Sequence, residues 1–131
     1  MSRGLGDVYK RQVYKNKPII GAISVPYLNE LYSACIGLGS FCNDNKLKVS
    51  SPSNLSESLL VTGFSYDRFE TEDNNYAEFC YLTHKTRGVR RGGAAAVDLA
   101  FVAAGKVDGY WERGLEAVSY THLTLPTRIF V

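Results

Sequence analysis

The segment VRRGGAAAVDL, residues 89–99, is the part of the sequence that decides the fold. It begins at Val89, which is expected to close a short strand, and Gly92 and Gly93 end that strand before a run of small and apolar residues. Every residue but one between positions 94 and 104 is apolar, which predicts a helix that is buried on nearly all sides. Gly105 follows this run and is typical of a helix C-terminal cap. The segment therefore predicts a strand followed directly by a buried helix.

Upstream of this segment, short apolar stretches alternate with polar turns. Residues 18–25 are rich in Ile and Val, and the polar residues 15–17 separate them from an apolar pair at 13–14, which predicts a β-hairpin. Residues 31–36 alternate apolar and small polar side chains with the period of a strand. Residues 46–50 are expected to form one more short strand. This half of the chain therefore predicts an antiparallel meander.

The rest of the chain alternates strand and helix patterns. Residues 53–58 indicate a loop or a single helical turn, and the compact apolar run 59–63 indicates a buried strand. Residues 73–84 have apolar side chains at helical spacing, with Asp73 as the expected N-cap. Residues 107–112 are expected to form the final strand. Hairpins followed by strand–helix alternation predict an α/β layered domain, in which an antiparallel meander is followed by a strand-helix-strand half.

Composition limits the class of protein. A chain of 131 residues with 45% hydrophobic and 21% charged residues is typical of a folded domain and not of a disordered segment. The net charge is +2 and the only basic cluster lies at residues 85–91, so we expect no nucleic-acid partner. The sequence has no apolar stretch of membrane-spanning length, so we expect no membrane association. Cys35, Cys42 and Cys80 are an odd number without metal-ligand spacing, which favours a reducing, cytoplasmic location.

The two ends of the chain can be encoded by DNA sequences that are reverse complements of each other. Residues 7–12 can be read from GATGTGTATAAGAGACAG, and the opposite strand, CTGTCTCTTATACACATC, encodes residues 118–122 in another frame. A natural domain has no physical reason for this relation, whereas a sequencing adaptor joined to both ends of a DNA piece produces it. We therefore interpret residues 1–12 and 118–131 as adaptor-like and residues 13–117 as the domain fragment. A nucleotide record without the inverted repeat would contradict this interpretation.

The glycine-rich part of the central segment is one place where chemistry could occur. Glycine lets a backbone approach a ligand closely, and the free N–H groups at the start of a helix attract oxygen-rich ligands. The sequence around Gly93 therefore fits a ligand-facing helix N-terminus. The alternative is that these small residues only allow close packing of a helix on a sheet, and spacing alone does not choose between the two.

Acidic residues are the other candidates. Glu112 ends an apolar strand where the chain turns, and a carboxylate in that position often faces a cleft. The alternative is a solvated side chain paired with Arg113. Asp98 could be an ion-pair partner within its helix. The acidic residues of the polar loop suggest metal ligands, but such clusters are more often solvated and lack the spacing of a calcium loop; they are Asp67, Glu70, Glu72 and Asp73.

Several of these segments together resemble the inositol monophosphatase family. The run from Gly88 to Glu116 carries the resemblance most strongly, with RRGGAAAVDLAFVAAG followed by DGYWERGL. Residues 21–31, 38–43 and 59–64 follow the same family's order and spacing. The resemblance covers residues 13–116, and several linked motifs in one order make it far more specific than a lone glycine pattern.

The resemblance implies an incomplete layered α/β sandwich of the inositol monophosphatase type and a hydrolase of inositol metabolism. Members are phosphatases in which magnesium ions bridge the phosphate and activate a water molecule, and many are lithium-sensitive. Gly93, Ala94 and Ala95 fall on the family's Gly-Thr-Ala substrate loop, and Glu112 falls on the carboxylate that accepts a hydrogen bond from an inositol hydroxyl. Ala94 stands where some members have Thr, so one hydroxyl group is missing from the substrate loop.

The resemblance also implies that the catalytic and metal-binding residues lie outside this sequence. In the family they come from an upstream Glu, an Asp-Pro-x-Asp segment and a Trp-Asp pair, which this sequence lacks. We therefore expect the parent protein to use Mg2+ to hydrolyse inositol monophosphate and to form a homodimer. The 131-residue chain itself is expected to be inactive. Histidinol phosphate and sugar or nucleotide phosphates are alternative substrates. A non-catalytic binding module is an alternative of another class.

Overall fold

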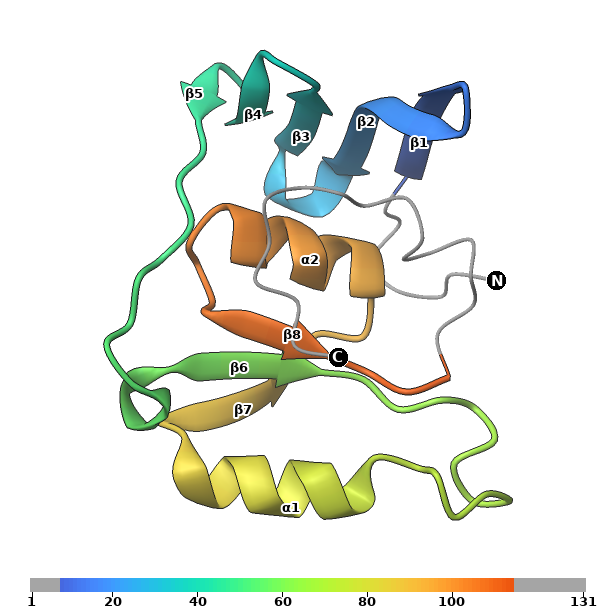
Figure 1. Cartoon of the computed structure of the whole chain (residues 1–131), viewed down its shortest axis with the longest axis vertical. Coiled ribbons are helices and arrows are strands. Elements are labelled where there is room, and N and C mark those ends of the chain that lie inside the picture. The colour runs from blue at the N-terminus through green and yellow to red at the C-terminus, as the bar shows by residue number, and fades with distance from the viewer. Residues whose placement is uncertain (1–7, 115–131) are drawn as a thin grey trace.

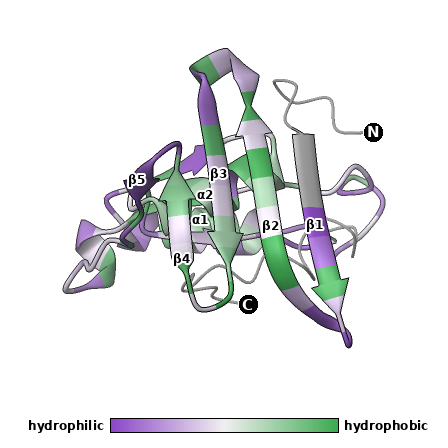
Figure 2. Ribbon diagram, turned by 90° about the horizontal axis from the view of Figure 1, so that it is seen from above, coloured by the Kyte–Doolittle hydropathy of each residue, from purple (hydrophilic) through white to green (hydrophobic). Residues whose placement is uncertain are grey.

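The computed structural model describes residues 8–114, and its first half is an antiparallel sheet. The five strands lie side by side in chain order, and β2 shows extended hydrophobic segments (Figure 2). The strands are β1 (Val8–Tyr14), β2 (Lys17–Val25), β3 (Glu30–Cys35), β4 (Gly39–Cys42) and β5 (Asn45–Lys46). Short 3-10 turns at Pro26–Leu28 and Leu55–Glu57 follow β2 and precede the second half. The predicted meander is confirmed.

The second half is a small parallel sheet with a helix on each face. Its strand order is β7-β6-β8, with β6 pairing in parallel with both neighbours. The elements are β6 (Leu59–Thr62), α1 (Tyr76–Lys85), β7 (Gly88–Arg91), α2 (Ala95–Ala103) and β8 (Gly109–Trp111). The layers follow one another as meander, α2, parallel sheet and α1 (Figure 1). The predicted α/β layered sandwich, with a strand-helix-strand second half, is therefore confirmed.

Helix α2 is the centre of the hydrophobic core because it lies between the two sheets. Six of its nine residues are buried, and Leu99 is 2% exposed. Burial of one such leucine side chain contributes roughly 1.5 to 3 kcal/mol. The residues that meet α2 in the core come from both sheets and include Ile23, Val25 and Tyr32 of the meander and Val61 and Tyr110 of the parallel sheet. A helix covered on two sides must be apolar all round, which is the pattern that the sequence carries.

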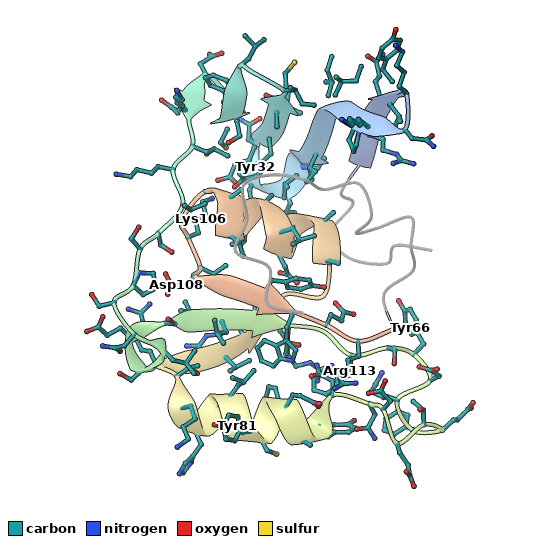
Figure 3. The ribbon with its side chains drawn as sticks, in the orientation of Figure 1. Tyr32, Tyr66, Tyr81, Lys106, Asp108 and Arg113 are labelled. Atoms are coloured by element: carbon teal, nitrogen blue, oxygen red, sulfur yellow. The ribbon has the colours of Figure 1, made fainter. Side chains whose placement is uncertain are left out.

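A polar cluster joins the meander to the chain just after α2. Lys106 Nζ lies 2.6 Å from Glu30 Oε1 and 3.0 Å from the hydroxyl oxygen of Tyr32. The same ammonium group lies 4.7 Å from the ring centroid of Phe101. The hydrogen bonds from Lys106 and then from Tyr32 lower the pKa of Glu30. Figure 3 shows Lys106 and Tyr32 next to each other at this end of α2, so the cluster fixes the spacing of the two layers.

Three local predictions differ from the structure. Strand β4 was not predicted, because glycine and serine hide its alternation and only pairing with β3 forms it. The predicted strand 46–50 is wrong beyond Lys46, since the chain leaves the sheet there and its backbone at Lys48 lies against Gly105. Asp73 is not the N-cap of α1. Asn75 takes that position with φ of 71°, a left-handed conformation that asparagine tolerates better than most residues.

The boundaries proposed for the adaptor-like ends stay predictions. Strand β1 begins at Val8, so its first five residues lie in the segment 1–12 that we interpret as adaptor-like. Ladder hydrogen bonds use only backbone groups, so this pairing does not depend on the origin of the side chains. Residues 115–131 lie outside the described residues. Among residues 8–114 no helix has the length and hydrophobicity needed to cross a bilayer.

Candidate functional site

A cavity of about 440 Å³ opens where the three parallel strands end. Thr62 is in register with Arg91 of β7 and with Trp111 of β8, so the carboxyl ends of all three strands meet at one edge. Ligands of open α/β sheets bind at such edges. The lining residues come from the segment after β6, from β7, from the start of α2 and from the segment after β8: Thr62, Gly63, Phe64, Tyr66, Arg68, Arg91, Gly93, Ala94, Ala95, Asp98 and Glu112.

The structure brings all four substrate-binding candidates to this cavity. Gly93, Ala94 and Ala95 line it at the N-terminus of α2, and Glu112 lines it from the segment after β8. Gly93 has φ of +87°, and a Cβ atom there would meet nothing within 4 Å. Glycine is therefore favoured at position 93 by the backbone conformation and not by lack of space. The roles of these four residues in binding substrate stay predictions.

Glu112 is held in the cavity by its neighbours on the sheet. A Cβ atom at Gly63 would lie 2.6 Å from the Glu112 Cδ, so the carboxylate occupies the space that a side chain at position 63 would need. The Tyr110 hydroxyl donates a hydrogen bond to Glu112 Oε2. Burial raises the pKa of Glu112, and the hydrogen bond from Tyr110 opposes that shift. The alternative of a solvated pair with Arg113 is wrong.

Arg113 instead binds two acidic groups near the start of α1. Its guanidinium group pairs with Asp73, and its Nη2 lies 2.6 Å from Glu78 Oε1. Asp73 is thereby engaged in an ion pair. Within residues 8–114 no group of three or more His, Cys, Asp or Glu side chains is arranged to hold a metal ion, and this includes the acidic loop at 67–73.

Asp98 is the functional candidate that sequence reasoning did not select. It lines the cavity from α2, yet the residue is only 4% exposed. A Cβ atom at Gly92 would lie 2.7 Å from Asp98 Cγ, so the carboxyl group lies against that glycine. Burial, and then the negative charge of Glu112, raises the pKa of Asp98 to about 7. The available signal was one acidic residue in an otherwise apolar helix.

The ion pair considered for Asp98 is not formed in the described part of the chain. No hydrogen bond or salt bridge of its carboxyl group is present among residues 8–114. A buried carboxyl group without a partner is costly, which makes the position unusual for a residue that only supports the fold.

A buried asparagine joins the ends of β6 and β8, next to the lining residues Gly63 and Glu112. Asn75 Nδ2 donates to Thr62 Oγ1 at 2.8 Å and to the Gly63 carbonyl oxygen at 2.9 Å. Asn75 Oδ1 accepts a hydrogen bond from Trp111 Nε1 at 2.5 Å. Thr62 Oγ1 in turn donates to the Trp111 carbonyl oxygen at 2.6 Å. This network sets the distance between Gly63 and the residue after Trp111, which is Glu112.

Basic and aromatic side chains line the cavity together with the acidic ones. Arg68 and Arg91 line it, and the Arg91 guanidinium lies 4.6 Å from the ring centroid of Phe64. Tyr66 is 88% exposed and lies on the loop after β6 (Figure 3). Two guanidinium groups in the lining favour the approach of an anionic ligand. The arrangement can therefore attract an anion while presenting carboxyl groups to its uncharged polar part.

The described residues do not by themselves fit a magnesium site. Mg2+ requires near-octahedral oxygen ligands, and the cavity offers the carboxyl groups of Asp98 and Glu112. Both groups have a raised pKa, which means that their surroundings disfavour the charged form. Any ligands for magnesium would have to come from outside residues 8–114.

The sequence matches a known protein family. The model of the inositol monophosphatase family matches residues 12–121. An inositol-1-monophosphatase of Synechocystis is 55% identical over 98 residues, which are 75% of this chain and 34% of that relative. The protein named Nus factor SuhB of Pseudomonas aeruginosa is 38% identical over 104 residues, which are 78% of this chain and 38% of that relative. The chain thus spans only about a third to two fifths of these relatives' length.

Solved structures show the same fold. The structure of an inositol monophosphatase from Anabaena (Nostoc) is 53% identical, with a TM-score of 0.84, and the match covers 88% of this chain and 46% of that one. The structure titled Mycobacterium tuberculosis SuhB is 33% identical with a TM-score of 0.75, and the match covers 86% of this chain and 47% of that one.

Proposed function

The chain belongs to the inositol monophosphatase family, and we propose that the intact protein hydrolyses a phosphomonoester of a polyol, with inositol monophosphate as the leading substrate. The observation that supports this most is the presence of the Gly93–Ala95 backbone and the half-buried carboxylate of Glu112 in one cavity. Its volume of about 440 Å³ lies within the range of small-molecule sites, which is roughly 300 to 1,000 Å³.

In this proposal the residues of the chain bind and orient the substrate. The free N–H groups at the start of α2 meet substrate oxygens, because they have no partner within the helix. Glu112 accepts a hydrogen bond from a substrate hydroxyl through the oxygen that Tyr110 does not occupy. Arg68 and Arg91 draw the anionic substrate toward the mouth of the cavity.

Magnesium, which the family resemblance implies, would stabilise charge on the transferring phosphoryl group and lower the pKa of a water molecule. We propose that its ligands lie in parts of the intact protein outside residues 8–114. Lithium sensitivity, a cytoplasmic location and homodimerisation belong to the same proposal. The three free cysteines among the described residues are compatible with a reducing compartment.

A substrate panel on the intact protein tests the proposed function. With millimolar magnesium we expect the highest kcat/KM for inositol monophosphate, ahead of histidinol phosphate, a sugar bisphosphate and phosphoadenosine phosphate. Preference for another member of the panel would keep the reaction and correct the substrate. Absence of turnover with all four would contradict the function and favour a non-catalytic binding module.

Recovery of the uninterrupted reading frame is an independent test. We expect an upstream Glu and the segment Asp-Pro-x-Asp-Gly-Thr-Thr, and Trp-Asp directly after residue 117. Absence of both would refute the proposed metal site. Some relatives carry the name Nus factor, but no observation on residues 8–114 favours that second function here.

A further inference from the structure

We propose that Asp98 is a second substrate-recognition residue, whose carboxyl group donates a hydrogen bond to the same substrate hydroxyl that donates one to Glu112. This inference rests on the proposed function, because it concerns the polyol part of a phosphomonoester. It goes beyond the family resemblance, which implies binding roles for Gly93, Ala94, Ala95 and Glu112 and none for Asp98.

The position of Asp98 supports a role toward a ligand. The residue is 4% exposed, lines the cavity, and forms no hydrogen bond or ion pair within residues 8–114. Desolvation of a polar group without a partner costs free energy, so folds generally avoid it. Two glycines make room for the acidic pair, because a Cβ at Gly92 or Gly63 would overlap the carboxyl groups of Asp98 and Glu112 respectively.

The surroundings of Asp98 decide whether its carboxyl group is protonated. The charged and titratable side chains around it are Glu112 and Tyr110 from the β8 segment, together with Arg68, Arg91 and Tyr66 of the cavity lining. Burial and the charge of Glu112 raise the pKa of Asp98 to about 7, so its carboxyl group holds a proton at slightly acidic to neutral pH. Burial also raises the pKa of Glu112, but the hydrogen bond from Tyr110 opposes that shift, whereas Asp98 has no such donor within residues 8–114, so Glu112 is the member of the pair that ionises first. The pair then offers one donor and one acceptor.

A hydroxyl group is the ligand that matches this pair. It can donate a hydrogen bond to Glu112 and accept one from Asp98 at the same oxygen. An ammonium group has donors only, so it cannot accept from a protonated carboxyl group. The pair therefore selects a neutral polyol over an amine-bearing substrate such as histidinol phosphate.

Two substitutions in the intact protein test the inference. Asp98→Leu removes the donor and should lower kcat/KM for inositol monophosphate about 10-fold or more, the effect of losing one buried hydrogen bond to a substrate. Asp98→Asn keeps a donor of the same size and should lower it about 3-fold or less. For phenyl phosphate, which has no polyol, both substitutions should have equal and small effects. Titration calorimetry with inositol monophosphate in the absence of magnesium gives a second measurement that does not need turnover.

Three results would overturn the inference. An equal loss for inositol monophosphate and phenyl phosphate would make Asp98 a structural residue. A loss in Asp98→Asn as large as in Asp98→Leu would show that an ionised carboxylate is needed. Unchanged binding and turnover in Asp98→Leu would remove Asp98 from the site. Binding without turnover in the wild type would contradict the proposed function alone. Absence of both binding and turnover would contradict the proposed function and this inference together.

Discussion

The carboxylate of Glu112 lies directly over Gly63, in the space that a side chain at position 63 would fill. A Cβ atom on Gly63 would be 2.6 Å from Glu112 Cδ and 2.7 Å from Oε1. The two residues lie on neighbouring strand ends, and the network around Asn75 holds those ends together. The position of the acidic group therefore depends on the absence of a side chain on the next strand.

Substitution of Gly63 by alanine should displace Glu112. We expect kcat/KM of the intact protein for inositol monophosphate to fall by at least the factor caused by loss of Glu112 itself, with a stability loss of about 1 to 3 kcal/mol from overpacking. Steady-state kinetics and urea unfolding measure the two effects. Gly21→Ala on β2 is the matched control, because a Cβ there meets nothing within 4 Å. Wild-type kinetics in Gly63→Ala would show that Glu112 does not contact substrate from this position.

Glu112→Gln should weaken substrate orientation without removing the side chain. An ionised carboxylate accepts a hydrogen bond from a hydroxyl without changing its own charge, so we expect a role in binding and not in proton transfer. Loss of one charge-assisted hydrogen bond costs roughly 1.5 to 3 kcal/mol, or about 10- to 150-fold in kcat/KM. A specificity constant that stays the same for every phosphomonoester would refute the role predicted for Glu112.

Asn75→Ala should destabilise the protein by about 2 to 4 kcal/mol. The change leaves the Trp111 N–H group without its acceptor and the Gly63 carbonyl without its side-chain donor. It also places alanine at φ of 71°, which costs an L-residue about 1 to 2 kcal/mol. Asn75→Gly relieves the backbone strain but not the lost hydrogen bonds, so its stability should lie between those of Asn75→Ala and the wild type. Equal stability of all three in chemical unfolding would disprove the network's importance.

Asp98 should make stability depend on pH. Folding raises the pKa of this carboxyl group from 3.8 to about 7, so its contribution to the stability of the folded state is fully present below pH 3.8. That contribution is lost as pH rises toward 7, with a slope of up to about 1.4 kcal/mol per pH unit. Urea unfolding of the metal-free intact protein at pH 5 and pH 7.5 measures this effect. From pH 5 to pH 7.5 the free energy of unfolding should fall more in the wild type than in Asp98→Asn. Parallel pH profiles of the two proteins would mean that Asp98 titrates normally.

The 131-residue chain alone should not hydrolyse inositol monophosphate. Displacement by a metal-activated water requires magnesium held by several oxygen ligands, and the family's motifs for those ligands are absent from this sequence. The assay is turnover by the purified chain with millimolar magnesium. Clear lithium-sensitive hydrolysis would contradict this prediction, because it would show that the 131-residue chain itself holds a metal site.

Much of the fold could be predicted because its signals are local. The nearly all-apolar run after Gly93, with Gly105 at its end, specifies a buried helix, and the polar residues Lys15 and Asn16 specify the first hairpin turn, where both have positive φ. Strand β4 could not be predicted in this way, since its pairing with β3 and not its composition defines it. Asp73 has the chemistry of an N-cap, but the ion pair with Arg113, forty residues away, takes its carboxylate.

The sequence by itself determined the family, the alternation of strands and helices, and the candidates Gly93, Ala94, Ala95 and Glu112. Only the tertiary structure decided that Glu112 lies against Gly63 and away from Arg113, and that the carboxyl group of Asp98 is buried in the same cavity. Periodicity and capping act over a few neighbouring residues, so they can be recognised along the chain. The pKa of a carboxyl group depends on burial and on charges brought close by folding, and no local pattern records them.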